Sequence, residues 1–218
     1  MPRITEEYRA SRRAEIVSAA ARRFAEDGFH NTSMADLIAE SGMSAGAVYR
    51  YFRSKEEIIG AVAETALTTA EEVFERLLAD GATPSPAETV TALVEGAITK
   101  LARNAIEGVD TTRIAVQVWG EALRNPEIAE RTGSVYQRLR GHCAEVARRW
   151  QAAGNLPADA VPDQVGAAML ALGQGFLLQN LLIADTSAPA YLDGVRALLG
   201  GDLPARVELH LPAAAEPS

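Results

Sequence analysis

Cysteine and long hydrophobic runs are scarce in this chain of 218 residues. Cys143 is the only cysteine, so no disulfide can form within the chain, and a reducing cytoplasm is the expected location. The most apolar stretch, Val165 to Ala184, is interrupted by Gln174, Gln179 and Asn180, and no run reaches the roughly 18 apolar residues of a membrane span. The N-terminus, MPRITEEYRASRR, is charged from its start, which argues against a secretory signal. We therefore expect no membrane association.

Histidine is also scarce, and the sequence lacks the usual catalytic patterns. His30, His142 and His210 form no H-x-x-x-H motif, and neither paired cysteines nor an acidic triad suggests a metal site. His142 and Cys143 are adjacent on a predicted helix, where their side chains diverge by about 100° and form no ready dyad. No Gly-rich phosphate loop is present. We therefore expect neither an enzyme nor a protein with a metal or a cofactor.

Charge is unevenly distributed along the chain, whose net charge is −8. Residues 1–55 contain nine basic and seven acidic side chains, a balance of +2, and the remainder contains 12 basic and 22 acidic ones, a balance of −10. A positive head on a negative body would present one end of the molecule to a polyanion. Two solvated surfaces of different composition would give the same pattern.

Apolar periodicity and turn residues predict helices along the whole chain. Ile16, Ala20 and Phe24 recur every four residues, and Gly28 follows as a predicted C-cap. The predicted helices, about nine in total, cover residues 7–26, 33–41, 45–52, 54–79, 86–107, 110–124, 126–153, 162–184 and 188–200. The fold class is therefore all-α. We expect a three-helix helix-turn-helix domain at 1–54, a larger helical domain at 55–203, and an irregular tail at 204–218. Within the tail, Arg206 to Leu211 alternates enough to permit a short extended piece.

Two short helices joined by a turn at Gly42 predict the helix-turn-helix. If Val48 and Phe52 face the core, the exposed face of the second helix begins with small side chains that allow close approach to base edges. Hydroxyls and cations around it suit phosphate oxygens, and helix starts favour anions. The predicted DNA-binding residues are Thr32, Ser33, Ser44, Ala45, Gly46, Ala47, Tyr49, Arg50, Tyr51 and Lys55. Taken singly, each tyrosine could equally be a packing residue and Arg50 a solvated charge.

These motifs resemble a known family. Residues 9 to 62 are similar to the DNA-binding domain of the tetracycline-repressor (TetR) family, chiefly in Thr32-Ser33-Met34 and in SGMSAGAVYRYFRSKEE, the run from Ser41 to Glu57. The remainder matches that family only in helix count and length. One patch, WGEALRNPE from Trp119, resembles a subset that includes choline-responsive, BetI-like regulators. Many family members have Lys where this chain has Ala45, His at Tyr51 and Ala at Ile38, so the operator sequence cannot be inferred.

The resemblance implies a dimeric regulator, by default a repressor, that a small molecule releases from a pseudo-palindromic double-stranded DNA operator. It also implies a homodimer built on the last two long helices. The apolar candidates for that interface are Leu170, Gln174, Leu178, Leu181, Leu182, Tyr191, Val195 and Leu198. Packing within a single chain would require the same residues.

The predicted effector cavity lies among the helices of the larger domain, where glycine and alanine leave room. Its candidates are Phe74, Leu78, Val116, Gln117, Gly120, Tyr136, Leu139, Cys143, Met169, Gly173 and Phe176. Simple core packing is the alternative for each of them, and Trp119 is expected in a core or an interface. For the whole protein, the alternative is a helical ligand-binding or scaffold protein that no longer binds DNA.

Overall fold

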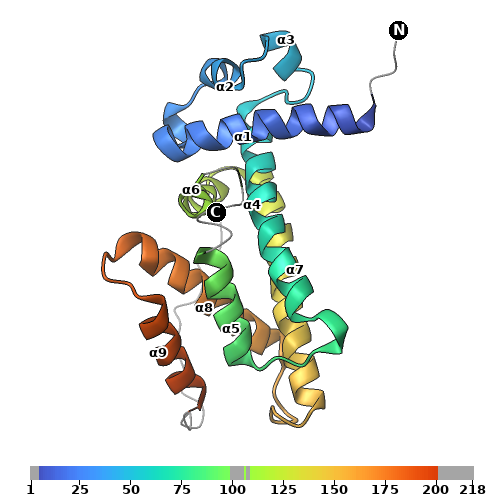
Figure 1. The fold of residues 1–218 in the computed structure, drawn as a ribbon, viewed down its shortest axis with the longest axis vertical. Helices are drawn as coiled ribbons and strands as arrows, with labels where there is room; N and C mark the ends of the chain where they lie inside the picture. The colour runs from blue at the N-terminus through green and yellow to red at the C-terminus, as the bar shows by residue number, and fades with distance from the viewer. Residues whose placement is uncertain (1–4, 99–105, 107–108, 201–218) are drawn as a thin grey trace, which may run out of the picture.

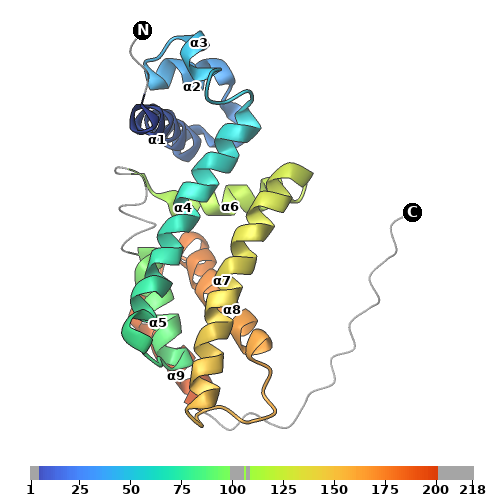
Figure 2. The same cartoon turned by 90° about the vertical axis from the view of Figure 1, so that its right-hand side faces the viewer.

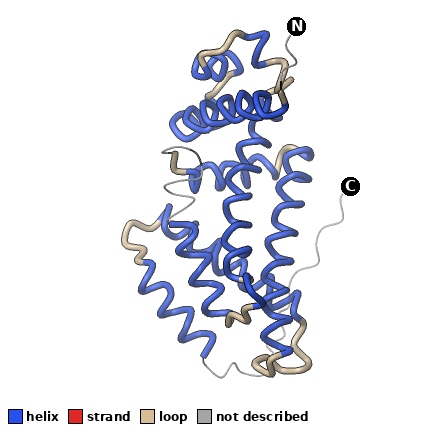
Figure 3. The backbone as a smooth tube through the Cα atoms, turned by 45° about the vertical axis from the view of Figure 1, so that its right-hand side comes forward, coloured by secondary structure: helices blue, strands red, loops and turns tan. Residues whose placement is uncertain are grey.

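The computed structural model describes residues 5–98, 106 and 109–200, apart from the side chains of 66–69 and 200. In this part of the chain every regular element is a helix, and one antiparallel bridge joins Ile106 to Val109 (Figure 3). The all-α prediction is therefore confirmed. The predicted tail at 204–218, its segment Arg206–Leu211 and part of the helix predicted at 86–107 lie outside the described residues.

Three helices form a head at one end of the elongated molecule: α1 (Glu6–Asn31), α2 (Met34–Ser41) and α3 (Ala45–Val48) (Figure 1). Regular helix in α1 is interrupted at Gly28, whose φ of 78° is sterically free only for glycine. The predicted stripe of Ile16, Ala20 and Phe24 is at most 1% exposed. This face packs α1 against α2 and α4, so the head is built around the stripe that the sequence indicates.

The body follows as α4 (Lys55–Leu77), a short 3-10 turn η1 (Ala79–Gly81), α5 (Pro86–Gly96), α6 (Thr111–Ala122), α7 (Pro126–Ala152), α8 (Pro162–Leu182) and α9 (Ala188–Gly200). The long helices α4 and α7 run side by side along the molecule, and α6 crosses beneath α1 (Figure 2). Most of these helices begin at a polar cap, as predicted from their turn residues. Arg149 on α7 fixes the α4–α5 connection by donating to the carbonyls of Leu78 and Ala82.

Two hydrophobic clusters fill the molecule. The first joins the head to the start of α4 and to α6, and it includes Phe24, Ile58 and Ile114, none more than 1% exposed. The second joins the lower part of α4 to α5, α7, α8 and α9. The predicted boundary between residues 54 and 55 therefore falls inside a continuous core, because the first turns of α4 pack with the head. Both α4 and α6 are therefore in direct packing contact with the helices of the head.

The packing of α8 on α7 depends on a close approach of their backbones. A Cβ atom built on Gly166 would lie 2.6 Å from the backbone nitrogen of Ala144, which is nearer than any real Cβ contact. Ala144 is itself fully buried. Glycine is therefore required at position 166 for the two helices to meet at this distance.

The outer face of α8 is apolar but exposed in the single chain. Leu178 is 38% exposed and Leu182 is 73% exposed. By length and composition alone, α8 is the one helix among the described residues that could cross a membrane, with a mean hydropathy of 1.4 over a window that is 22% buried. This surface needs a cover that the isolated chain does not supply.

Candidate nucleic-acid interface and ligand cavity

The turn between α2 and α3 is held by local hydrogen bonds. Gly42 has a φ of 64° and donates its backbone N–H to the carbonyl of Ala39. The Ser41 hydroxyl donates to the carbonyl of Ile38 at 2.8 Å and accepts the N–H of Met43 at 3.2 Å. The Ser44 side chain then accepts from the N–H of Ala47 and begins α3. These hydrogen bonds fix the angle between the two helices.

The helix α3 presents the faces that its sequence predicts. Val48 is fully buried and Phe52 is 2% exposed, while Ala45 and Gly46 face solvent. The regular helix ends at Val48, but the N–H of Phe52 still donates to the carbonyl of Val48 at 3.0 Å, so the backbone remains helix-like to that point. The exposed end of α3 carries no bulky side chain that would keep its backbone away from a flat partner.

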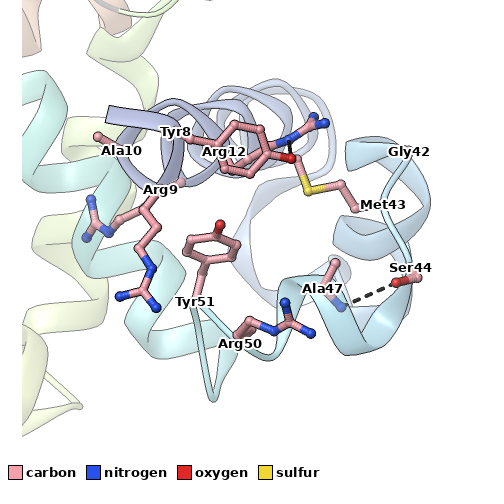
Figure 4. A pocket seen from close by; sticks show the side chains of 11 residues that line it. Tyr8, Arg9, Ala10, Arg12, Gly42, Met43, Ser44, Ala47, Arg50 and Tyr51 are labelled. Atoms are coloured by element: carbon pink, nitrogen blue, oxygen red, sulfur yellow. Dashed lines mark hydrogen bonds between the residues drawn. The ribbon is translucent and has the colours of Figure 1, made fainter. Parts of the chain in front are cut away.

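A groove of about 670 Å³ lies between the start of α1 and α3, and its wall is rich in cationic side chains (Figure 4). Every charged side chain that the described residues contribute to its wall is an arginine: Arg9, Arg12, Arg13 and Arg50. Tyr51 stands between Arg9 and Arg50 at its centre. Three of these arginines come from α1 and one from beyond α3, so the fold concentrates positive charge beside the exposed small residues.

Two of the three arginines from α1, Arg12 and Arg13, are held in place by neighbouring side chains. The Arg12 guanidinium donates to the Tyr8 hydroxyl at 3.1 Å and to the Glu15 carboxylate at 2.6 Å. The Arg13 guanidinium lies 5.0 Å from the ring centroid of Phe52, a cation–π contact. Arg9 was not singled out from the sequence. The signal that could have found it is its position one turn before Arg13 on an otherwise solvated helix face.

Two predicted phosphate contacts turn inward instead. Thr32 is 1% exposed, and its hydroxyl donates to the carbonyl of Gly28 at 2.8 Å. The ammonium of Lys55 donates to the carbonyls of Phe29 at 2.8 Å and Thr32 at 3.1 Å. Both side chains satisfy carbonyls at the end of α1, which otherwise have no helical partner. The prediction for Thr32 is therefore corrected, and Lys55 has a structural role that its sequence position did not reveal.

Ser33 is exposed, but its hydroxyl is already engaged. It accepts from the N–H of Asp36 at 3.2 Å and donates to the Asp36 carboxylate at 2.6 Å, and that carboxylate also accepts the N–H of Ser33. These hydrogen bonds hold the pKa of the Asp36 carboxyl below its usual range. The N-terminus of α2 thus already has an anion beside it, the Asp36 carboxylate. Of the predicted residues, Ser44, Ala45, Gly46, Tyr49 and Arg50 are exposed, and Ala47 and Tyr51 are half-buried in the groove.

One face of α6 contacts the head, and a different face lines the cavity described in the next paragraph. The Gln117 side chain accepts the N–H of Phe29 at 3.1 Å and donates to the carbonyl of Phe24 at 3.3 Å. One turn further, Glu121 lies 3.7 Å from His30. Gln117 and the exposed Gly120 therefore face α1, and their predicted place in the effector cavity is corrected. Gln117 is two residues from both Ala115 and Trp119, which line the cavity, so it lies about 160° around the helix from them.

An apolar cavity of about 70 Å³ lies between α4, α5, α6, α7 and α8. Of the predicted residues, Tyr136, Leu139 and Gly173 line it. Prediction missed Ala70, Val73, Leu93, Gly96, Ala97, Ala115, Trp119 and Leu177, and it assigned Leu170 and Gln174 to the dimer interface. A distributed set of small residues on five helices gives no local signal, because only packing brings the members together.

The remaining cavity candidates are not part of its wall. Phe74, Cys143, Met169 and Phe176 are at most 2% exposed inside the second cluster, and Leu78 packs against it. Val116 is half-buried beside the cavity-lining face of α6. Burial raises the pKa of the Cys143 thiol to about 12, so the thiol stays protonated at neutral pH. In this structure, apart from Val116, these side chains pack in the second cluster and not in the wall of the cavity.

The candidates for the dimer interface also divide. Leu178, Leu182 and Leu198 are 38%, 73% and 63% exposed, and Leu181 is half-buried. Val195 is 3% exposed in the second cluster, and the Tyr191 hydroxyl donates to the carbonyl of Leu172 at 2.6 Å. Those two residues hold α9 to α8 within one chain. Ile183 and Leu199, which were not predicted, extend the exposed apolar face.

Comparison with known proteins agrees with this arrangement. A family profile described as bacterial regulatory proteins, tetR family, matches residues 16–62, and one described as the C-terminal part of BetI-type transcriptional repressors matches residues 105–201. The transcriptional regulator UidR of Escherichia coli strain K12 is 28% identical over 198 residues, which make up 88% of this chain and 93% of that protein.

Solved structures show the same architecture. GusR of Salmonella enterica is 28% identical with a TM-score of 0.68, and the match covers 92% of this chain and 100% of that one. A transcriptional regulator from Saccharomonospora viridis, solved in complex with choline, has a TM-score of 0.70 at 23% identity, covering 88% of this chain and 96% of that one. The second likeness shows the fold alone. Taken with the helix-turn-helix and the helical body, these matches establish that the chain belongs to the tetracycline-repressor (TetR) family of transcriptional regulators.

Proposed function

We propose that this protein is a dimeric repressor that leaves a pseudo-palindromic operator when a small molecule occupies the cavity between α4 and α8. The observation that carries the proposal is the arginine-lined groove beside the exposed small residues of α3. Small side chains let a helix approach base edges in a major groove about 12 Å wide. Arginines and tyrosine hydroxyls beside it suit the phosphates on either side.

A helical protein that no longer binds DNA is the alternative, and the net charge of −8 favours it. The gathering of four arginines around one hollow argues against it. Arg12 is paired with Glu15, and a polyanion would relieve the repulsion among the remaining positive charges. A head without a nucleic-acid partner gains nothing from that arrangement, so we favour DNA binding.

Dimerisation through α8 and α9 would cover the apolar surface that the single chain leaves exposed. Leu178, Leu182, Ile183, Leu198 and Leu199 together supply that surface. An interface of this kind relates two copies by a two-fold axis, and the two copies of α3 must then lie roughly 34–36 Å apart to read successive major grooves. We assign the apolar face of α8 to this interface rather than to a membrane, and we place the protein in the cytoplasm.

Coupling between cavity and head would pass through α4 and α6. Both helices line the cavity and also share the first hydrophobic cluster with the head. A molecule that spreads them would change the spacing of the two heads. To take the operator from nearly full to nearly empty, it must favour the released state by about 5.5 kcal/mol.

DNA binding is tested by selecting genomic duplexes with the purified protein and measuring affinity by fluorescence anisotropy at several salt concentrations. We expect affinity to fall steeply between about 50 and 200 mM salt, because each neutralised phosphate adds about 0.9 to the slope of log affinity against log salt concentration. Arg50→Ala should reduce that slope by about 0.9, the contribution of one phosphate. Tyr49→Phe should weaken binding about tenfold across sequences, since it removes one hydrogen bond to a charged group.

The matched control for these variants is Arg113→Ala, because Arg113 is an exposed arginine at the start of α6, on the body. It should leave both affinity and slope unchanged. A wild-type protein without salt-sensitive affinity for any selected duplex would remove the proposed function. A reporter gene placed behind the selected operator then establishes repression, if the protein lowers its expression.

A further inference from the structure

Three side chains belong to two hollows at once. Trp119 on α6, Tyr136 on α7 and Gln174 on α8 line the 70 Å³ cavity, and the same three line a more open groove of about 520 Å³ on the surface of these helices. The remaining wall of the groove includes Leu123 and Leu178, which are 89% and 38% exposed. The cavity and the groove are therefore separated by one layer of side chains.

The layer is closed by hydrogen bonds between its own members. The indole N–H of Trp119 donates to the Tyr136 hydroxyl at 2.6 Å, and Gln174 is within hydrogen-bonding reach of the same hydroxyl. The two rings lie 6.3 Å apart between centroids and are tilted by 52°. Burial raises the pKa of Tyr136, so the hydroxyl keeps its proton. In the closed layer these polar groups satisfy one another, and once separated they need other partners.

We propose that Trp119, Tyr136 and Gln174 form a gate through which the effector enters, and that they then bind an uncharged aromatic molecule carrying one hydrogen-bonding group. This inference rests on the proposed function and assigns its effector class. The cavity is far smaller than the roughly 300–1,000 Å³ of ordinary ligand sites, so a ligand must enlarge it. With the gate open, the cavity and the groove become continuous. The polar group of the ligand then replaces the hydrogen bond between Trp119 and Tyr136 that opening breaks.

The lining disfavours an anionic ligand. Apart from the Tyr136 hydroxyl, no side chain that the described residues contribute to the cavity wall can ionise. An anion moved into such surroundings loses its hydration without gaining a counter-charge. Two aromatic rings at the entrance instead favour a flat apolar molecule, through offset or edge-to-face contacts.

The inference is tested with the probe N-phenyl-1-naphthylamine, which is uncharged, aromatic and carries one N–H. Trp150 is the only other tryptophan, so Trp150→Phe leaves Trp119 as the sole emitter. Binding at the gate should quench Trp119 saturably by energy transfer to the probe. The sulfonated analogue, 1-anilinonaphthalene-8-sulfonate, should bind at least about tenfold more weakly because of its charge.

Two further variants test the gate and the cavity. Tyr136→Phe removes the hydroxyl and should accelerate both association and dissociation about 3- to 10-fold in stopped flow. Gly173→Leu and, from the opposite wall, Ala115→Leu should abolish the quenching by filling the cavity. The control is Val161→Ser, which lies just before α8, is 45% exposed and lines neither the cavity nor the groove, so it should change neither rates nor affinity.

The inference is overturned if quenching persists in the folded cavity-filling variants, if Tyr136→Phe leaves the rates unchanged, or if the sulfonated analogue binds equally well. It is also overturned if the probe releases DNA without affecting Trp119, since the effector site then lies elsewhere while the proposed function stands. The opposite failure is distinct. A protein that binds the probe at Trp119 but binds no duplex keeps the gate and loses the proposed function.

Discussion

The head and the body of this molecule are specified by different kinds of information. In the head, the short helices α2 and α3 and the turn between them are fixed by caps that involve residues within four positions of one another, such as Ser44 and Ala47. In the body, the decisive contacts join residues far apart in the sequence, such as Gly166 and Ala144 or Trp119 and Tyr136. The head is consequently recognisable from a short motif, while the cavity in the body is not.

The same helix-capping motif occurs in the head and in the body, which allows a controlled comparison of the two regions. Ser33 and Asp36 form a reciprocal capping box at the start of α2, and Ser85 and Glu88 form the same box at the start of α5. Where chemistry is local, head and body therefore behave alike. They differ only where tertiary packing decides the outcome, and the predictions below test that division.

The largest effect is expected from Gly166→Ala in the body. The new Cβ would lie 2.6 Å from backbone rather than from a movable side chain, so α7 and α8 must separate. We expect a loss of about 2–3 kcal/mol in the free energy of unfolding and a fall in Tm of roughly 4–12 °C, measured by circular dichroism. The control is Gly141→Ala on α7, where nothing lies within 4 Å of the added Cβ. It should be neutral or slightly stabilising, and equal losses in both variants would contradict the role of close packing.

Lys55→Met tests whether the head depends on an inward cation. The change keeps the apolar stem and removes both hydrogen bonds to carbonyls at the end of α1. Because the side chain is half-exposed, we expect a loss of about 1–2 kcal/mol, below the full value for charged hydrogen bonds. Hydrogen exchange of α1 and α2 should report it. Full protection together with weakened DNA binding would instead assign Lys55 to phosphate.

Gln117→Leu tests the connection between the two regions. The variant loses the hydrogen bonds to Phe24 and Phe29, yet it touches neither the cavity lining nor the arginine groove. Operator affinity without ligand should change little, and the shift in affinity caused by ligand should shrink by about 0.5–2 kcal/mol. Anisotropy titrations with and without the probe measure both. An unchanged shift would assign the coupling to α4 alone.

The smallest effect concerns pH and compares the two capping boxes directly. Hydrogen bonds from Ser33 and Ser85 lower the pKa of Asp36 and Glu88. A lowered folded-state pKa adds stability above the unfolded value, and this contribution is lost as pH falls through the folded value. Acid titrations of stability should therefore be shallower in Asp36→Asn and in Glu88→Gln than in the wild type. A difference in sign between the two would show that the boxes are not equivalent.

Sequence patterns predicted each element of the head, together with the helix order of the body. Val48 and Phe52 were assigned inward, and the turn was assigned to Gly42, because helical period and backbone freedom are readable from a few neighbouring residues. The sequence-based predictions failed where they depended on which face of a helix a side chain occupies. Gln117 was placed in the cavity and Gln174 in the dimer interface, and each lies on a different face from the one predicted.

By itself, the sequence determined an all-α chain, a helix-turn-helix near its start and a positive head on a negative body, because caps, periodicity and charge are local quantities. Only the tertiary structure decided that Lys55 and Thr32 close the end of α1, that arginines from α1 meet Arg50 across one groove, and that a tryptophan and a tyrosine separate a cavity from the surface. Those features depend on the distance and rotation between packed helices, which no single helix encodes.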